Sequence, residues 1–284
     1  HQRGIFDKDP AQIPPVVGCD KLEFTPGFTF QPSTSEAAKG TATTAHVHVD
    51  QARLLEPDKL APPHLKDSVV TLPEGLTLNP AAANGLEACT TAQIGYKGGG
   101  FPMPNPMRFD KEPVSCPDAS KIGTAEIKTP LLDKPLEGIV YLAAQDDNPF
   151  KSLLAMYIVI DDEETGIVAK LPGEVIPNEQ TGQLKAVFQN NPQVPFEDLI
   201  LRFRGGGPRS TLATPDVCGT YTTNGSWTPW SAPESGPPAV TNDSFTIYSG
   251  PGGSACAPTK AQRPFGLGFE AGTTQPKAGA HSPF

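Results

Sequence analysis

Two histidines on one expected strand are the residues of this chain best suited to hold a metal ion. His46 and His48 are separated by a single residue. Because side chains two positions apart leave a strand on the same face, the two imidazoles could share one ion. The expected strand, residues 44–49, contains no cysteine or carboxylate as a third ligand, and His64 lies beyond a turn of undefined path. We therefore predict no bound metal and interpret this pair as part of a polar strand face.

Acidic side chains crowd one expected hairpin. Asp161 and Asp162 are followed by two glutamates, between two apolar stretches. Calcium prefers oxygen ligands, but an EF-hand loop alternates its acids and carries a central glycine and a terminal glutamate, an order that is missing here. An exposed turn is the preferred interpretation and a bound calcium ion is the alternative. The run 146–148 before Pro149 is interpreted in the same way.

These acids, together with His46, also allow a hydrolase hypothesis. Glycosidases and related hydrolases need carboxylates in pairs at a defined separation, and nothing in the sequence sets such a pair. The sequence also lacks the recognisable contexts of nucleophilic catalysis, such as the G-x-S-x-G turn or a metal-binding H-E-x-x-H helix. The prediction is that the protein is not an enzyme and carries no cofactor.

Aromatic side chains suggest a different kind of site. Trp227 and Trp230 are the two tryptophans of the chain, and Tyr221 precedes them. Exposed aromatic faces can stack on sugar rings, so these three residues form a possible glycan-binding platform. Tryptophans in β-sheet proteins also pack against neighbouring strands, which is the competing interpretation.

The five cysteines have the spacing of structural bridges. Cys89 and Cys116 enclose a glycine- and proline-rich excursion, and Cys218 and Cys256 enclose a second turn-rich segment, so we predict these two disulfides. Cys19 is left over. The sequence after Phe30 matches that after Phe269 at an offset of 239 residues, and upstream of both runs Cys19 and Cys256 stand in nearly the same place. We therefore expect a repeat, with Cys19 either unpaired or linked to another molecule.

The elements that would position these residues are strands and turns. The chain of 284 residues contains 33 prolines and 28 glycines, which separate short apolar or alternating runs. This pattern predicts an all-β protein of tandem immunoglobulin-like antiparallel β-sandwich modules with proline-rich joints. A short helix is expected only after Asn79 and Pro80. The predicted boundaries are an N-terminal extended arm at 1–18, a first module at 19–115, a second at 116–265, and a C-terminal arm or start of the next repeat at 266–284.

Charge and cysteine usage limit the partners and the location. The net charge is −9, and the only small basic cluster contains Arg202, Arg204 and Arg209. Nucleic acids and anionic membranes require a basic surface, so we predict neither nucleic-acid binding nor membrane insertion. Cysteines at turn-rich positions, without metal-binding spacing, indicate an oxidising compartment. The predicted location is extracellular or at the cell surface.

Several motifs, taken as a set, resemble one group of proteins. They are Pro14–Asp20, Leu72–Pro80, Gly85–Cys89, Cys116–Pro117 with Ile122–Thr124, Thr129–Leu132, Asn148–Phe150, Thr181–Leu184, Pro192–Phe196 and Ala213–Gly219. The set is similar to large repetitive, predicted secreted or cell-surface proteins of actinobacteria. Those proteins have no established activity, so the resemblance implies a location and a repeat architecture and brings no catalytic residues.

These observations together predict a non-enzymatic extracellular structural or adhesive repeat protein. Its modules would form a surface layer, stalk or filament, with other copies or repeats of itself as partners and the arms 1–18 and 266–284 as docking strands. The alternative is a carbohydrate-binding module that uses Trp227 and Trp230, with cell-wall glycans as ligands.

Overall fold

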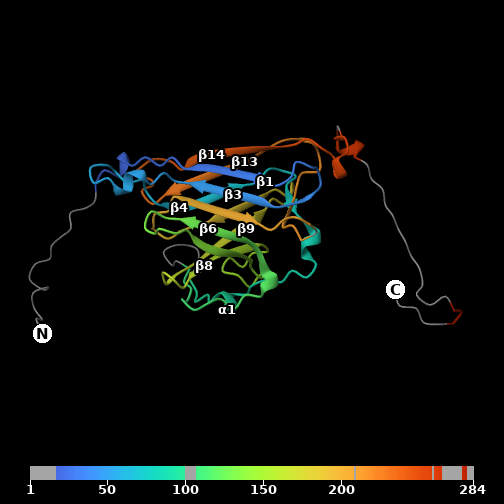
Figure 1. Cartoon of the computed structure of the whole chain (residues 1–284), viewed down its shortest axis with the longest axis horizontal. Helices are drawn as coiled ribbons and strands as arrows, with labels where there is room; N and C mark the ends of the chain where they lie inside the picture. The colour runs from blue at the N-terminus through green and yellow to red at the C-terminus, as the bar shows by residue number, and fades with distance from the viewer. Residues whose placement is uncertain (1–16, 100–106, 208, 258, 264–276, 280–284) are drawn as a thin grey trace, which may run out of the picture.

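The computed structural model describes residues 17–99, 107–207, 209–257, 259–263 and 277–279. Its main strands are β1 (Gly27–Pro32), β3 (Thr43–His48), β4 (Leu65–Thr71), β6 (Lys121–Lys128), β7 (Leu136–Leu142), β8 (Ala155–Asp162), β9 (Ile167–Pro177), β10 (Leu184–Phe188), β11 (Asp198–Phe203), β13 (Gly219–Pro229) and β14 (Ala239–Ile247). They form one antiparallel sheet in the order β1-β3-β11-β6-β7-β8-β9-β10-β4-β13-β14 (Figure 1). The prediction of an all-β, antiparallel protein is confirmed.

Smaller elements surround this sheet. A second sheet contains β2 (Gly40–Thr41), β12 (Leu212–Ala213) and β5 (Thr77–Leu78), with β12 in the middle. The helical elements are single turns: η1 (Cys19–Lys21), η2 (Ala52–Leu55), η3 (Pro80–Ala83), α1 (Thr91–Ile94), η4 (Asp118–Ser120), η5 (Pro251–Gly253) and η6 (Lys260–Gln262). The helix expected after Asn79 is η3, which is one turn long and starts with a hydrogen bond from the Ala81 amide to the Asn79 side chain.

The predicted division into two sandwiches is not what the structure shows. β3 and β4 lie in the predicted first module, yet β3 pairs with β11, and β4 pairs with β10 and β13, all from the predicted second module. The described strands on the two sides of residue 116 therefore share one sheet and cannot be separate modules. The pattern of short alternating strands correctly predicted antiparallel pairing. It does not show which strands far apart in the sequence pair with each other.

The sheet curls until its edge strands meet. In eleven strands paired antiparallel throughout, the first and the last run in the same direction, so β1 and β14 can close the sheet only as a parallel pair. A parallel bridge between Glu36 and Ser249, just beyond the two strands, has this direction. Along the strands themselves, the Asp243 carboxylate accepts hydrogen bonds from the Phe30 amide and the Gln31 side chain, each at 2.7 Å. We call this contact the seam.

Alternating side chains give the curled sheet an apolar inside. Phe28 and Phe30 of β1, and Val47 of β3, are buried in one cluster with Trp227 and Phe245. A second buried cluster, from β6, β7, β8 and β11, continues it. Intervening residues, such as Thr29 and His46, face outward. Period-two alternation over most strands is what a sheet with one wet face requires.

One part of the outer face is covered. Residues 155–160 of β8 are all buried, because the described parts of the segment from Cys89 to Cys116, residues 89–99 and 107–116, pack over the outer side of β7 and β8. Phe109 contacts Tyr157 edge-on, with ring centroids 6.5 Å apart. The buried Lys170 ammonium donates to the Asp110 carboxylate at 2.9 Å and to the Glu112 carbonyl at 2.7 Å. This double coverage explains why β8 reads as a continuous apolar run rather than an alternating one.

Candidate functional site

The curled sheet encloses an apolar cavity of about 690 Å³. Its lining comes from the strands of the main sheet other than β13 and β14, and includes Phe30, Ala45, Val70, Met156, Phe188 and Leu201. Side chains fill the interior of a barrel of about eight strands, whereas barrels with more strands enclose free space. Eleven strands therefore leave a lumen, and its volume falls within the roughly 300–1,000 Å³ of ligand pockets in proteins.

Polar lining residues gather at one end of the cavity. All of them lie at or beyond strand ends: Asn79, Asn84, Asp118, Lys121, Arg204, Arg209 and Thr211. This end is formed where β11 ends, β6 begins and η3 crosses. We call it the mouth. Leu78, at 43% exposure, adds an apolar side chain there.

The mouth carries two arginines. Arg204 is half-buried and Arg209 is exposed. Among the described residues, neither guanidinium makes a hydrogen bond or an ion pair. Lys121, by contrast, is engaged by Asp118 at 2.6 Å, and this contact lowers the pKa of Asp118 and raises that of Lys121. The mouth therefore offers free positive charge from its two arginines.

Backbone and amide contacts fix the mouth. The Arg204 amide donates to the Ile122 carbonyl at 2.8 Å, and the Arg204 carbonyl accepts from the Thr211 amide at 2.9 Å. The Asn79 side chain donates to the Ser210 carbonyl at 2.8 Å, which ties η3 to the loop that carries Arg209. Gly205 lies so close to the Ala42 backbone that a Cβ would overlap it, so glycine is required at this crossing.

The three aromatic residues do not form an exposed platform. Trp227 is only 1% exposed, packs on Phe28 with ring centroids 5.2 Å apart, and donates from Nε1 to the Thr241 hydroxyl. Trp230 is half-buried; its Nε1 donates to the Asn191 carbonyl, and Lys66 lies over its ring. Tyr221 stacks on Phe245 and donates to the Val217 carbonyl. A sugar cannot stack on Trp227, because that indole is inside the sheet.

The acidic turn is part of a hairpin between β8 and β9. Asp162 accepts hydrogen bonds from the amide and the hydroxyl of Thr165, which lower its pKa. Glu164 pairs with Lys134 at 3.0 Å. Asp161 and its neighbours are not among the groups of described residues that converge closely enough to share an ion. In the next turn, Asn148 is fully buried and binds four backbone groups of its own loop, consistent with a structural role.

The histidine pair does gain a third polar partner. Asp198 of β11 lies beside His46 and His48 of β3, with its Oδ1 at 2.7 Å from His46 Nε2 and 2.8 Å from His48 Nδ1. Burial raises the pKa of Asp198, but the two imidazole hydrogen bonds outweigh it and the net shift is downward. The sequence could not show this group, because Asp198 is 150 residues from His48.

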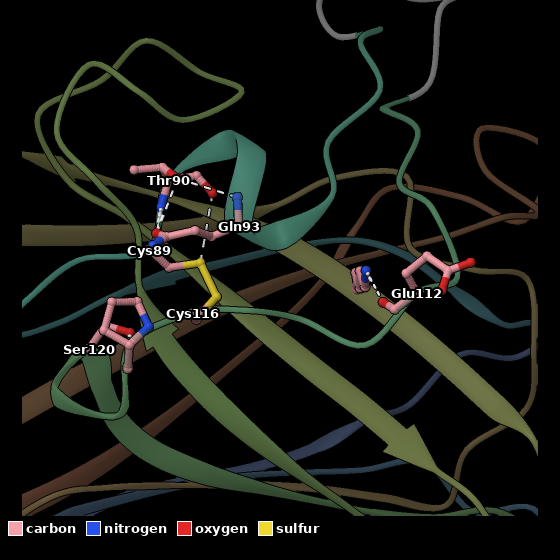
Figure 2. The surroundings of a disulfide bond; sticks show 8 residues. Cys89, Thr90, Gln93, Glu112, Cys116 and Ser120 are labelled. Atoms are coloured by element: carbon pink, nitrogen blue, oxygen red, sulfur yellow. Dashed lines mark hydrogen bonds between the residues drawn. A yellow bond between two sulfur atoms is a disulfide. The ribbon is translucent and has the colours of Figure 1, made fainter.

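The cysteines are joined in the pairs that the sequence predicts. Cys89 is bonded to Cys116 and Cys218 to Cys256, while Cys19 has no disulfide partner. Figure 2 shows Cys89 immediately before α1, where Thr90 and Gln93 cap the helix start by reciprocal hydrogen bonds. Disulfides are rare in reducing compartments, so two of them indicate a non-cytoplasmic location. In the described part of the chain, no helix has the length and apolarity needed to cross a membrane.

Comparisons with protein-family models, with curated proteins and with solved structures find no match. The resemblance to repetitive actinobacterial surface proteins therefore stays a prediction. The arms at 1–18 and 266–284, and the repeated run after Phe269, lie almost entirely outside the described residues.

Proposed function

We propose that the protein binds an amphiphile with an anionic head group, outside the cytoplasm. The hydrocarbon part occupies the cavity, and the head group lies at the mouth beside Arg204 and Arg209. The observation that carries this proposal is the combination of a large apolar lumen with two arginines at its mouth that form no ion pair with any described residue. A single-chain acid, such as a fatty acid, is the simplest molecule with both properties.

The size of the cavity argues against a permanently empty interior. At about 24 cal/mol per Å³, a sealed void of 690 Å³ would cost roughly 17 kcal/mol, more than the ~5–15 kcal/mol by which domains are stable. Water entering through the mouth would find few hydrogen-bond partners deeper inside, and ordered water needs about three. A hydrocarbon chain is therefore more stable in this apolar interior than water is, because it needs no hydrogen-bond partners.

Binding of a chain in the lumen predicts a dependence on chain length. Each buried methylene contributes about 0.8 kcal/mol, so affinity should rise about fourfold per methylene until the cavity is full. We would measure this by displacement of a fluorescent fatty acid with saturated acids from octanoate to stearate. Affinity that is independent of chain length would contradict the proposal.

A cavity-filling variant tests the location of the ligand. Ala186 lines the cavity, whereas its neighbour Lys185 in β10 is exposed on the outer face. Ala186→Trp should lower the affinity roughly 15- to 60-fold, because the indole replaces two or three methylenes of the ligand. Lys185→Trp is the matched control and should bind as the wild type does. Equal affinities in all three proteins would place any binding elsewhere on the molecule.

The finer location, extracellular or at the cell surface, belongs to this proposal and is supported by the two disulfides. The structural or adhesive role in a layer, stalk or filament stays a prediction. Electron microscopy of the native material tests it, since a filament or layer would be visible whether or not the cavity holds a ligand.

A further inference from the structure

A polar cluster on the outer face lies away from the mouth. His46 and His48 are near the end of β3, and Asp198 is the first residue of β11, whereas the mouth lies where β3 begins and β11 ends. The three side chains are 35%, 45% and 21% exposed. They are thus accessible to small solutes, yet the cluster is not part of the cavity.

The sheet fixes the positions of these side chains. Asp198 stands directly opposite His48 in the ladder between β11 and β3, and His46 is opposite Ile200. Both strands are paired on their second edge as well, β3 with β1 and β11 with β6. Val47 is buried on the inner face, so a slip by one residue would expose it. The backbone therefore holds the cluster without help from any ligand.

The donor atoms are those of a transition-metal site. One imidazole nitrogen from each histidine and one carboxylate oxygen lie within 4.8 Å of one another, and this is the only such group found in the described part of the chain. We propose that His46, His48 and Asp198 bind a divalent transition-metal ion, Zn²⁺ in the first instance. Two imidazoles and one carboxylate suit zinc, while calcium requires a shell of oxygens.

Binding requires the side chains to adjust. Metal–ligand bonds of about 2.0–2.1 Å in a tetrahedron separate the ligand atoms by roughly 3.3 Å. Each imidazole nitrogen must therefore move about half an ångström away from the Asp198 oxygen, and the two nitrogens, which lie within 4.8 Å of each other, must reach the same separation. The nitrogens that face Asp198 must be free of protons to bind the ion, so each neutral imidazole would carry its proton on its other ring nitrogen. The remaining coordination positions point to solvent and would be taken by water.

The surroundings leave the carboxylate available. Lys128 of β6 stands opposite Asp198, but its ammonium pairs with Glu197 at 2.8 Å. On the other side, Gly27 of β1 is opposite His48 and offers no side chain to cover it. Thr29, opposite His46, adds a small polar side chain. Within the described residues, the cluster therefore has space above it and a carboxylate that is not neutralised by a lysine contact.

The test uses protein without a histidine tag. Isothermal titration with Zn²⁺ should give one equivalent of bound metal, and Co²⁺ should give the visible absorption of a low-coordinate nitrogen–oxygen site. His48→Ala and Asp198→Asn should each weaken binding at least tenfold, since even changes around metal ligands cost about 10- to 100-fold. Asp198→Asn keeps a hydrogen-bond acceptor, and unchanged melting of both metal-free variants would show that the fold is intact.

A histidine-number control separates this site from unspecific binding. A variant with His1→Ala and His281→Ala removes two histidines outside the described residues and should bind Zn²⁺ as the wild type does. Because the cluster is distant from the mouth, prior loading with a fatty acid should leave the Zn²⁺ affinity unchanged. No binding by the wild type, or equal binding by the double variant His46→Ala/His48→Ala, would overturn the proposal.

Discussion

Single residues set the charge of the mouth and the stability of the segment from Cys89 to Cys116 that covers β7 and β8. The three arginines that cluster in the sequence have different surroundings: Arg202 pairs with Glu126 on the outer face at 2.8 Å, whereas Arg204 and Arg209 line the mouth. The net charge of the whole chain, −9, gives no indication of this difference between the three arginines. Two unpaired cations on an acidic protein mark a place for an anion more clearly than the same charges would on a basic one.

Reversal of the mouth charges should weaken binding of acids selectively. In the variant Arg204→Glu/Arg209→Glu, we expect a fatty acid to bind at least tenfold more weakly, a loss of about 1.4 kcal/mol, because carboxylates replace its cationic partners. The fatty alcohol of the same length should lose little. Arg202→Glu is the matched control, since its side chain points away from the cavity. Displacement titrations give all the values, and an equal loss for acid and alcohol would argue against recognition of the head group.

Asp110 should make the stability of the protein depend on pH in the acidic range. The ammonium groups of Lys170 and Lys97 lower the pKa of Asp110 from 3.8 to about 2. A carboxylate with a lowered folded-state pKa stabilises the protein fully above its ordinary pKa, and this contribution is lost as the pH falls through the folded value. The stability difference between wild type and Asp110→Asn should therefore be constant above about pH 5 and shrink toward pH 2. Melting temperatures of both proteins across this range measure it; a constant difference would mean that Asp110 does not titrate there.

Among the elements, the covering segment from Cys89 to Cys116 depends on local chemistry and on one bridge. α1 is only one turn long, so its capping box and its terminal Gly95, in the left-handed conformation at φ 79°, hold it together. A Cβ at Gly95 would overlap the Asp110 carboxylate, which explains why glycine ends this helix. Such a short helix gains little from hydrogen bonding alone and relies on packing against β8.

Removal of the first disulfide should loosen this segment. The bridge closes a loop of 27 residues, for which the chain-entropy model gives about 3.5 kcal/mol. In the variant Cys89→Ala/Cys116→Ala, the free energy of unfolding measured by denaturant titration should fall by about this amount. The rate of amide hydrogen exchange should rise most in α1 and in β8, which this segment covers. An equal loss of protection throughout the sheet would indicate that the bridge supports the whole fold rather than its cover.

The sequence predicts local features well and distant pairings poorly. Bridges between cysteines close in sequence, and strand alternation such as that in β3, are written in neighbouring residues. The S/T-x-x-Q capping signal of Thr90 and Gln93 was also there to be read and would have predicted α1. The pairing of β3 with β11 could not be predicted from the sequence, because many strands share the same alternation of apolar and polar residues and any of them could pair with β3. The lumen and the Asp198 cluster both depend on that pairing, so neither could be foreseen.

For the whole molecule, closure of the sheet is its least regular feature. Between β1 and β14 the central contacts run through the Asp243 side chain rather than a continuous backbone ladder. Side-chain contacts at one carboxylate are easier to break than a row of backbone hydrogen bonds. The seam is therefore the weakest contact between neighbouring strands of the curled sheet.

Substitution of Asp243 should open the seam first. Asp243→Ala leaves the Phe30 amide without its partner, which should cost about 1.5–3 kcal/mol for a charge-assisted hydrogen bond. We expect faster hydrogen exchange in β1 and β14 than in β6 to β9. Ser244→Ala is the control, because its hydroxyl contacts Thr222 on the outer face. Protection in β1 and β14 that is the same in both variants would show that Asp243 does not hold the edges together.

The first and last single-turn helices of the sheet domain, η1 and η6, lie at opposite ends of the long axis (Figure 1). A polypeptide that carries such units in succession, as the 239-residue offset predicts, would run through each unit from one pole to the other. The cavities of neighbouring units would then not be connected. The number of amphiphile molecules that one polypeptide could bind would grow with the number of units, and damage to one unit would leave binding by the others intact.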